Sequence, residues 1–378
     1  MPWSRRAMLS TSALGLLGLR RGAPVSVRPT APLRVLVLGG TGFLGPHMVR
    51  EALTRGHRIT LFTRGRSGTE LFPDVERLTG DRAGNLEALR GHRWDAVIDN
   101  SGYFPAHVAA STQALQASAD HYFYTSTIDA YRDFHTVGIT EDYPLAVLPA
   151  NAPHDANGFY GPLKALCEQE VRRAFPGRHT IVRPGWVAGP GDNNHLFTYW
   201  VMRTARGGRI LAPGTPNDPV QLTDARDLAA FAIDAVEQRH PGAYNLVGPV
   251  LTFGEMLGSL QRLTATPGDL TWVDADFLRQ HKVLPYFDLP LWWPPRNDYE
   301  AVIPNGGLGG GIGAFTINGA KARAVGYTSR ALDETARDTL RWYREAFGTW
   351  EGERRPGLSV ERETTLLEAW RAARRAPP

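Results

Sequence analysis

The chain has little cysteine, and it has no long hydrophobic run. Cys167 is the one cysteine among 378 residues, so no disulfide can form within the chain. No apolar stretch approaches the roughly 18 residues that a membrane-spanning helix needs. The histidines lack HxxxH and HExxH spacing, and the chain has no CxxC pair. We therefore expect no transmembrane segment and no bound metal.

The positive charge of the chain is small and dispersed. The formal net charge is +4, and among the basic residues only Lys164, Lys282 and Lys321 are lysines. A protein that binds nucleic acid usually gathers basic side chains on one face, and the sequence shows no such cluster. Nucleic acid is therefore not an expected partner. The hydrophobic content of 42% is typical of a globular protein with a substantial core.

The first 31 residues have the features of an export signal followed by a linker. Arg5-Arg6 precedes a weakly apolar stretch at 7–19, which resembles the twin-arginine signal of proteins that are exported after folding. Arg20-Arg21 follows directly, and no clear cleavage site is present. A disordered extension on a cytoplasmic protein is the alternative. In either case we expect residues 1–31 to lie outside the fold.

A dinucleotide-binding turn is predicted directly after the first strand. The apolar run at 33–38 is typical of a buried parallel strand, and helical periodicity follows it as far as Gly56. Glycines spaced GxxGxxG between a strand and a helix allow a pyrophosphate to approach the backbone at the helix N-terminus. The residues of this turn that we expect to bind the cofactor are Gly39, Thr41, Gly42, Phe43, Leu44 and Gly45.

The end of the second predicted strand, at 58–63, indicates which dinucleotide is bound. NAD-binding proteins usually carry an acidic residue there, whereas this chain reads Thr63-Arg64-Gly65-Arg66. Because arginine can hold a 2′-phosphate, Arg64 favours NADP(H) over NAD(H). The alternative is that Arg64 and Arg66 are solvated surface charges.

Two later apolar strands are followed by polar residues. The run at 96–98 leads to Asn100 and Ser101, and the run at 121–124 leads to Ser126 and Thr127. Strands separated by helical segments predict an α/β fold with a doubly wound parallel sheet, and ligands bind at the carboxyl ends of such strands.

Tyr160 and Lys164 are the residues best suited to proton transfer. They begin a segment with helical periodicity, and residues four apart share one face of a helix. An ammonium beside a phenol is expected to lower the pKa of the phenol. Such a tyrosine can exchange a proton with a substrate hydroxyl or carbonyl group, and the lysine can also hold the nicotinamide ribose.

These motifs resemble the extended short-chain dehydrogenase/reductase superfamily and, more narrowly, its bacterial NAD-dependent epimerase/dehydratase family. The resemblance extends from 33 to about 345 and is carried by GGTGFLG at 39–45, TSTIDAY at 125–131, YGPLK at 160–164 and RPGWVAGPGD at 183–192.

The resemblance implies a Rossmann fold and a role for each of several residues. Tyr160 would be the catalytic acid/base with Lys164 as its partner, Thr127 the catalytic hydroxyl with Ser126 as fallback, and Asp81 a neighbour of the adenine. The chain departs from the family pattern in two places. Arg64 stands where NAD-binding relatives carry aspartate. A long segment separates Thr127 from Tyr160, which we expect to form a loop or lid over the cleft.

The expected domains follow from the same resemblance. The dinucleotide-binding domain would span 32–192 with a return segment at 216–249, and a smaller C-terminal substrate-binding cap would comprise 193–215 and 250–345. A helical extension would occupy 346–378. Within the cap, five aromatic residues are predicted either to line the substrate site or to form the core of the cap: Trp272, Tyr286, Phe287, Trp292 and Trp293. The glycine-rich stretch at 305–315 is expected to be a loop near the site.

The resemblance leaves three functions open. An epimerase or dehydratase would remove a hydride from a sugar or another hydroxyl or carbonyl compound and return it, so that its cofactor ends unchanged. An NADPH-dependent carbonyl reductase would consume its cofactor. A non-catalytic member would bind a dinucleotide or RNA.

The sequence narrowly favours the first function. Export favours it because reduced nicotinamide is not regenerated outside the cytoplasm, whereas Arg64 favours the reductase. Tyr160, Lys164 and Thr127 argue against the non-catalytic alternative. We therefore predict an enzyme with a small-molecule substrate, and a homodimer is a further expectation from the resemblance.

Overall fold

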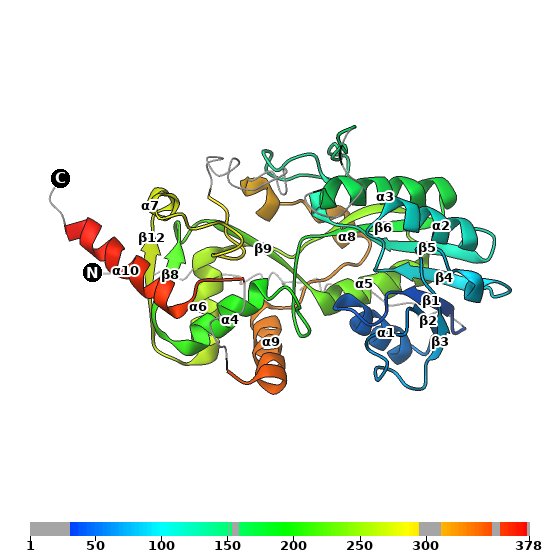
Figure 1. Ribbon diagram of the computed structural model, residues 1–378, viewed down its shortest axis with the longest axis horizontal. Coiled ribbons are helices and arrows are strands. Elements are labelled where there is room, and N and C mark those ends of the chain that lie inside the picture. The colour runs from blue at the N-terminus through cyan, green and yellow to red at the C-terminus, as the bar shows by residue number, and fades with distance from the viewer. Residues whose placement is uncertain (1–30, 151, 153–158, 295–310, 350–355, 376–378) are drawn as a thin grey trace, which may run out of the picture.

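The protein consists of two lobes, which lie side by side along its longest axis (Figure 1). The computed structural model describes residues 31–150, 152, 159–294, 311–349 and 356–375. The segment at 1–30, with its candidate export signal, lies outside the described residues. No helix in the described ranges is long and apolar enough to cross a membrane.

The first lobe is built on a sheet of seven parallel strands in the order β10-β6-β5-β4-β1-β2-β3. The strand order reverses between β1 and β4, which makes the sheet doubly wound and opens a crevice at the carboxyl ends of these strands. This confirms the predicted fold class. The strands are β1 (Arg34–Leu38), β2 (Arg58–Thr63), β3 (Glu76–Thr79), β4 (Trp94–Asp99), β5 (Ala119–Thr125), β6 (His179–Pro184) and β10 (Gly242–Leu246).

Helices cover both faces of this sheet (Figure 1). On one face lie α1 (Leu44–Thr54) and α5 (Ala225–Gln238), and on the other lie α2 (Pro105–Leu115) and α3 (Tyr160–Ala174). Alternate side chains of β1 pack into different cores, with Val35 and Val37 in the α1–α5 core and Leu36 and Leu38 in the α2–α3 core. Burial on both faces explains why this strand reads as a continuous apolar run.

The sequence analysis predicted four of the seven strands and did not predict β3, β6 and β10. β3 is a four-residue edge strand, ERLT, and none of its residues is fully buried. It is held by β2 through backbone pairing and by the Thr60 hydroxyl, which donates to Glu76 Oε2 at 2.7 Å. Since the strand has no apolar run, its sequence carries no signal of burial.

The second lobe has its own hydrophobic core. The core contains Trp200, Phe253 and Trp292, and it is enclosed by helices and two small sheets, β12-β8 and β11-β9-β7. Its strands are β7 (Trp186–Ala188), β8 (Gly208–Pro213), β9 (Pro219–Asp224), β11 (Val250–Thr252) and β12 (Gly268–Val273). Its helices are α4 (Leu196–Arg206), α6 (Phe253–Thr264), α7 (Ala275–Gln280), α9 (Leu332–Phe347) and α10 (Val360–Arg375).

The five aromatic residues that the sequence singled out have different positions. Trp292 lies in the core of the second lobe and Trp272 packs against it, while Trp293 is buried in a smaller cluster with Phe134. Phe287 is exposed. Tyr286 lines the cavity described below. Of the five aromatic residues, some therefore form a core and Tyr286 lines the cavity, so neither interpretation applies to all of them.

Residues 312–327 pack against the first lobe although the sequence assigned them to the cap. They contain η5 (Ile312–Phe315) and α8 (Ala320–Ala324), and Ala322 and Tyr327 belong to the α1–α5 core. A Cβ at Gly313 would overlap the carbonyl oxygen of Phe134, so this end of the glycine-rich stretch is closely packed. Its residues 305–310 lie outside the described residues. The division into domains stays a prediction.

The segment between Thr127 and Tyr160 is anchored in its first half. It begins with η2 (Ile128–Ala130), and the Ala146 N–H donates to the Ala130 carbonyl at 2.8 Å. Arg183 Nη1 donates to the Glu141 carbonyl at 3.0 Å. These contacts anchor this part to the first lobe, and its role as a loop or lid over the cleft stays a prediction. His154, which lies in the second half, is outside the described residues.

Helix α10 is joined to the second lobe by a buried ion pair. The Glu363 carboxylate accepts hydrogen bonds from Arg203 Nε at 2.8 Å, from Arg206 Nη2 at 2.6 Å and from the Leu211 N–H at 3.0 Å. Leu366 and Leu367 of the same helix are buried in the core of this lobe.

Glu363→Ala should therefore lower the free energy of unfolding by about 3–5 kcal/mol, because it leaves the buried Arg203 guanidinium without its counter-charge. Urea denaturation of the purified protein measures this change. Glu368→Ala, on the exposed face of the same helix, should change it by less than about 0.5 kcal/mol. An equal loss of unfolding free energy in the two variants would contradict the role of the Glu363 ion pair in holding α10 on the second lobe.

Candidate active site

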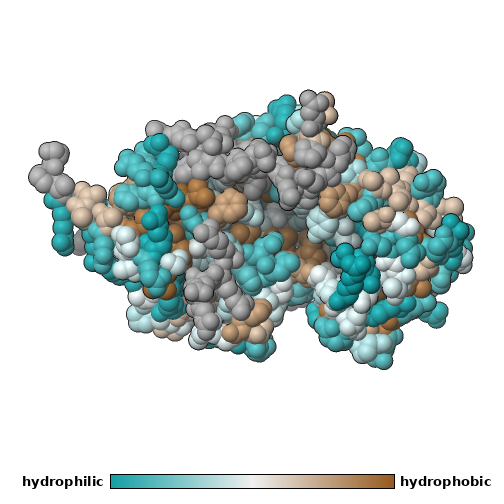
Figure 2. Space-filling model, viewed as in Figure 1, coloured by the Kyte–Doolittle hydropathy of each residue, from teal (hydrophilic) through white to brown (hydrophobic). Residues whose placement is uncertain are grey.

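A cavity of about 830 Å³ lies at the carboxyl ends of the strands of the large sheet and extends to residues of the second lobe. Its volume is within the range of ligand-binding pockets. On the face in Figure 2, a notch separates the two lobes, and hydrophobic surface lies at its floor. All residues that the sequence analysis proposed for cofactor binding or catalysis line this one cavity: Gly39, Thr41, Gly42, Phe43, Leu44, Gly45, Arg64, Asp81, Asn100, Ser101, Ser126, Thr127, Tyr160 and Lys164. Their roles stay predictions.

The glycine turn has the geometry of a pyrophosphate cradle. Gly39 has φ +88°, and a Cβ there would lie 2.6 Å from the Cβ of Ser101. A Cβ at Gly45 would overlap the Gly39 carbonyl oxygen, so the absence of a side chain allows the start of α1 to lie against the turn. A Cβ at Gly42 would meet no atom within 4 Å, which leaves open space beside the helix N-terminus. The residues present therefore fit a dinucleotide.

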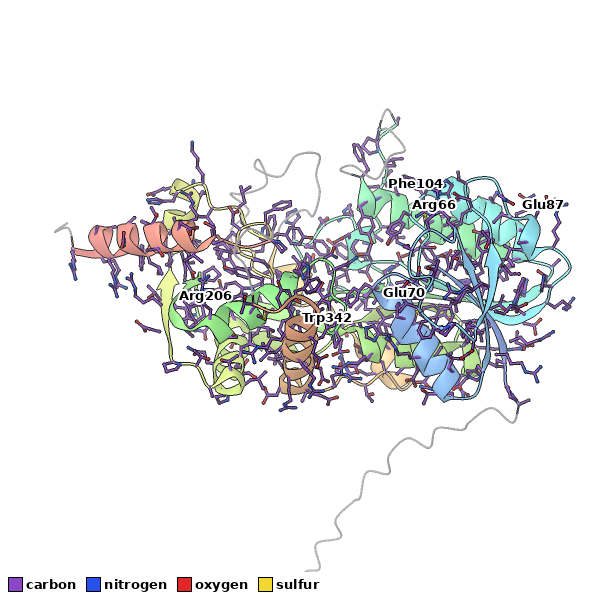
Figure 3. All side chains as sticks on the ribbon, turned by 60° about the horizontal axis from the view of Figure 1, so that its bottom comes forward. Arg66, Glu70, Glu87, Phe104, Arg206 and Trp342 are labelled. Atoms are coloured by element: carbon purple, nitrogen blue, oxygen red, sulfur yellow. The ribbon has the colours of Figure 1, made fainter. Side chains whose placement is uncertain are left out.

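The arginines after β2 are the free cations of this part of the cavity. Arg64 and Arg66 line it, both are exposed, and no carboxylate lies in the turn from Thr63 to Ser67. Figure 3 shows Arg66 on the same lobe as Phe104, which also lines the cavity. Arg82 is nearby, but its guanidinium donates to both carboxylate oxygens of Asp99 at 2.6 Å. Arg64 and Arg66 therefore differ from Arg82 in having no ion pair with a carboxylate in the described structure, and a role in holding a 2′-phosphate stays a prediction.

Polar groups at the ends of β3 and β4 complete the cofactor side. Asp81 Oδ1 accepts from the Ala83 N–H at 3.0 Å and shapes the turn before Arg82. Asn100 Oδ1 accepts from the Thr125 hydroxyl at 3.0 Å, while its buried Nδ2 has no hydrogen-bond partner in the described structure. Ser101 Oγ accepts from Arg82 Nη1 at 3.1 Å. Asn100 thus keeps a donor available for a ligand.

Lys164 is buried and fixed by the ends of two strands. Its ammonium donates to the carbonyl oxygens of Thr125 at 2.6 Å and Gly102 at 2.9 Å. The nitrogen also lies 4.3 Å from the ring centroid of Tyr124. Burial lowers the pKa of Lys164 to about 8. Two of its three donors are used by the backbone, which leaves one for a ligand.

Tyr160 differs from the sequence prediction in its ionisation. The phenol was expected to have a lowered pKa beside Lys164. Instead, burial and then the negative charge of Asp129 raise the pKa of Tyr160 above its ordinary value, against a lowering by a hydrogen bond with Thr127. The ammonium of Lys164 points to strand carbonyls, so its effect does not dominate. A phenol with a raised pKa is neutral at neutral pH.

Packing between α3 and η2 places Tyr160 beside the candidate hydroxyl group. A Cβ at Gly161 would overlap the Asp129 carbonyl oxygen, so only glycine allows this approach. Thr127 caps η2, since its Oγ1 accepts from the Asp129 N–H at 3.2 Å. Ser126 is fixed one residue earlier, where its N–H donates to the Val182 carbonyl at 2.7 Å.

A buried network supports this arrangement from behind. Arg183 Nε and Nη2 donate to the two oxygens of Glu168 at 2.9 and 2.7 Å, and Arg183 Nη1 donates to the Tyr131 hydroxyl at 3.1 Å. The Tyr131 hydroxyl in turn donates to Asn245 Oδ1 at 2.7 Å. These contacts join β6, α3, the segment after η2, and β10.

The cavity also contains residues that the sequence analysis did not select for the site. The Tyr103 ring lies 6.3 Å from the Tyr160 ring, and Trp186 lies 5.4 Å from Tyr286. Asp129 lines the cavity beside Tyr160. In the sequence, Asp129 could have been identified as a site residue because it is a carboxylate between apolar residues in TSTIDAY. Trp186 had no comparable signal, because folding brings β7 and a loop of the second lobe together, whereas Tyr286 was among the aromatic residues of the cap that the sequence singled out.

A comparison with models of protein families shows to which family the chain belongs. Residues 35–247 match the model of the NAD dependent epimerase/dehydratase family. The chain belongs to this family. It is therefore an enzyme of an NAD-dependent family, and its relatives include proteins named as a reductase and an epimerase.

Individual relatives are distant and differ in activity. The chain is 29% identical over 232 residues to the 2-alkyl-3-oxoalkanoate reductase of Stenotrophomonas maltophilia, covering 56% of this chain and 67% of that protein. It is 25% identical over 241 residues to the chloroplast stem-loop binding protein of 41 kDa b of Arabidopsis thaliana, covering 59% of this chain and 60% of that protein. The fold is similar to that of the UDP-N-acetylglucosamine 4-epimerase of Bacillus cereus, with a TM-score of 0.60 and 18% identity over 82% of this chain and 96% of that one.

No group of three or more potential metal ligands comes together in the part of the chain that the structure describes. The candidate site is therefore built from hydroxyl, carboxyl, amide and cationic side chains together with backbone groups.

Variants of Gly45 and Gly42 distinguish the effect of these glycines on stability from their effect on cofactor binding. Gly45→Ala should destabilise the protein by about 1–3 kcal/mol, because the added methyl group overlaps backbone atoms. Gly42→Ala should keep the stability within about 0.5 kcal/mol, because its methyl group has space. It should nevertheless weaken dinucleotide binding about tenfold, by filling the space beside the helix N-terminus.

Thermal unfolding and fluorescence titration with NADH and NADPH measure the two effects. If Gly42→Ala bound both dinucleotides as tightly as the unchanged protein, the cofactor would not lie against this turn.

Proposed function

We propose that this enzyme is an epimerase or dehydratase that moves a hydride reversibly between its nicotinamide cofactor and a substrate carbon bearing a hydroxyl or carbonyl group. One observation supports this most strongly: Tyr160, Thr127 and Lys164 line the same cavity as the glycine turn. Family membership supports a nicotinamide cofactor, which supplies the hydride acceptor and donor when it is bound.

In this proposal Tyr160 is the catalytic acid/base. Its neutral phenol donates a proton to the substrate oxygen when that oxygen is a carbonyl, and the phenolate takes the proton back in the reverse direction. The Thr127 hydroxyl hydrogen-bonds the phenol and favours the phenolate. The Lys164 cation, fixed by two strand ends, orients the bound ribose.

The second lobe supplies the substrate side of the cavity. Trp186, Tyr286, Asn193 and Asn194 line the cavity. Aromatic side chains offer flat apolar faces that suit a sugar ring, and amides offer hydrogen bonds to hydroxyl groups. This favours a sugar or a similarly polar compound as the substrate.

An NADPH-dependent carbonyl reductase is the second candidate. Arg64 and Arg66 favour a 2′-phosphate, and the raised pKa of Tyr160 suits proton donation to a carbonyl. The likeness to a reductase of Stenotrophomonas maltophilia is compatible with this reading. The two candidates differ in whether turnover consumes reduced cofactor.

We further propose export by the twin-arginine route, on the strength of Arg5-Arg6 and the stretch at 7–19. A protein that is exported folded can take a retained cofactor with it, which suits a reaction that regenerates the cofactor. The alternative is a cytoplasmic protein. A homodimer stays a prediction.

Tyr160→Phe should lower turnover by about 10² or more, because phenylalanine cannot exchange the proton. Dinucleotide affinity should stay unchanged, which fluorescence titration checks. Tyr143→Phe is the matched control, because Tyr143 lies outside the cavity lining and its hydroxyl donates to Asp133 Oδ1 at 2.6 Å. Near-normal turnover of Tyr160→Phe would exclude the acid/base role.

Arg64→Asp should reverse the cofactor preference. The guanidinium is lost and a carboxylate that can hold ribose hydroxyls is gained, so the ratio of the Kd values for NADP and NAD should rise about tenfold or more. Arg90→Asp, at an exposed arginine outside the cavity, serves as the control. An unchanged ratio in Arg64→Asp would show that Arg64 is only a surface charge.

A further inference from the structure

Tyr103 is an exposed aromatic residue of the cavity that has no task in the proposed reaction. It follows β4 and lines the cavity together with Tyr160 and Lys164. Tyr103 is 47% exposed, and none of the other exposed large hydrophobic residues in the described ranges lines this cavity. An open aromatic face in the wall of a binding cavity suits contact with a flat ligand group.

The backbone before Tyr103 is held by contacts with three elements. The Gly102 carbonyl oxygen accepts hydrogen bonds from the Tyr124 hydroxyl of β5 at 2.7 Å and from the Lys164 ammonium of α3 at 2.9 Å. A Cβ at Gly102 would lie 2.7 Å from a side-chain carbon of Val108, so the chain lies close against α2 there. Tyr103 therefore projects into the cavity from a fixed part of the fold.

The Tyr103 ring lies beside the two side chains that the proposed function places at the reacting end. Its centroid is 6.3 Å from that of the Tyr160 ring and 5.5 Å from the Lys164 nitrogen. A proton donor and a hydride donor act on the oxygen and the carbon of one bond, so a nicotinamide that reacts with Tyr160 must bind close to it. Tyr103 therefore borders the region in which the nicotinamide must bind.

Three other aromatic side chains of the cavity are less exposed and pack against protein groups. Trp186 and Tyr286 pack against each other, with ring centroids 5.4 Å apart. Phe104 lies edge-to-face with His107, with ring centroids 5.2 Å apart. Of these four aromatic residues, Tyr103 alone is exposed. Its ring is therefore the one with the most open surface for a ligand.

The two redox states of a nicotinamide differ in charge, so an aromatic contact does not stabilise them equally. The oxidised ring is a cation and the reduced ring is neutral, and the face of an aromatic side chain attracts a cation. The Lys164 ammonium repels a cationic ring, but it lies closer to the Tyr124 ring, at 4.3 Å, than to the Tyr103 ring. The attraction by Tyr103 would offset this repulsion.

We propose that Tyr103 is a cofactor-binding residue whose ring contacts the nicotinamide and makes the protein favour the oxidised dinucleotide over the reduced one. This inference rests on the proposed function, because it takes Tyr160 and Lys164 to mark where the nicotinamide binds. It adds a residue that sets which redox state of the cofactor is held. Such a preference suits an enzyme that begins its cycle by accepting a hydride from the substrate.

Competition between the two redox states measures this preference. The full-length protein is equilibrated with an excess of NADP⁺ and NADPH in equal amounts, and separately with NAD⁺ and NADH. Free nucleotide is removed, and the bound forms are quantified by chromatography. Tyr103→Leu should lower the ratio of bound oxidised to bound reduced dinucleotide by about 3-fold to 10-fold, the scale of a cation–π contact. The change should be the same for both pairs, because they share the nicotinamide.

Two further variants separate the aromatic contact from other effects. Tyr103→Phe should keep the ratio of the unchanged protein, because it retains an aromatic ring. Phe347→Leu, at an exposed aromatic residue outside the cavity lining, should keep it as well. Thermal unfolding of Tyr103→Leu should resemble that of the unchanged protein, because the side chain that it replaces is exposed.

Several outcomes would overturn the inference. The ratio could stay the same in Tyr103→Leu, or it could fall equally in Tyr103→Phe or Phe347→Leu. The unchanged protein could bind neither redox state, or Tyr103→Leu could fail to fold, which would make the residue structural. Failure of the proposed function is distinguishable, because the bound ratio needs no turnover, whereas that failure would appear as near-normal turnover of Tyr160→Phe.

Discussion

The buried ammonium of Lys164 is the interaction on which the site depends. It binds the carbonyl oxygens that follow β4 and end β5, and it thereby fixes the first turn of α3 over the carboxyl edge of the sheet. Tyr160 occupies the start of that turn, and Gly161 allows η2 to pack against it. A cation held in this way by backbone carbonyls positions the Tyr160 phenol before any ligand binds, and the proposed acid/base role of this phenol would need such pre-organisation.

The sequence predicted the parts of the fold that are encoded locally. The run at 33–38 and β2 read as buried strands because both faces of the sheet are covered, and the glycine spacing predicted the turn between β1 and α1. The edge strand β3 has no such pattern. The direction of the Tyr160 pKa shift was predicted wrongly. Spacing on a helix shows that Lys164 is near, but it does not show that the ammonium binds backbone carbonyls or that burial raises the pKa of the phenol. Asp129 and Trp186 come to line the same cavity only through tertiary packing.

Charge in the cavity is arranged in two regions with different tasks. At the cofactor end, Arg82 is neutralised by Asp99, so the exposed Arg64 and Arg66 remain as free cations. At the reacting end, Lys164, Tyr160 and Asp129 form a nearly dry group in which burial keeps the phenol neutral. In the proposed function, cofactor choice and substrate choice would therefore be made by separate residues. This separation is compatible with a family in which one fold serves epimerases and reductases.

The account is tested most directly by identifying the nucleotide that the protein carries. The protein is expressed without residues 1–31, dialysed extensively and denatured, and any released nucleotide is identified and quantified by chromatography. An enzyme that returns its hydride in each cycle predicts close to one nicotinamide dinucleotide per chain. A protein that emerges empty and binds NADPH reversibly in the micromolar range would contradict it and favour a reductase that exchanges its cofactor.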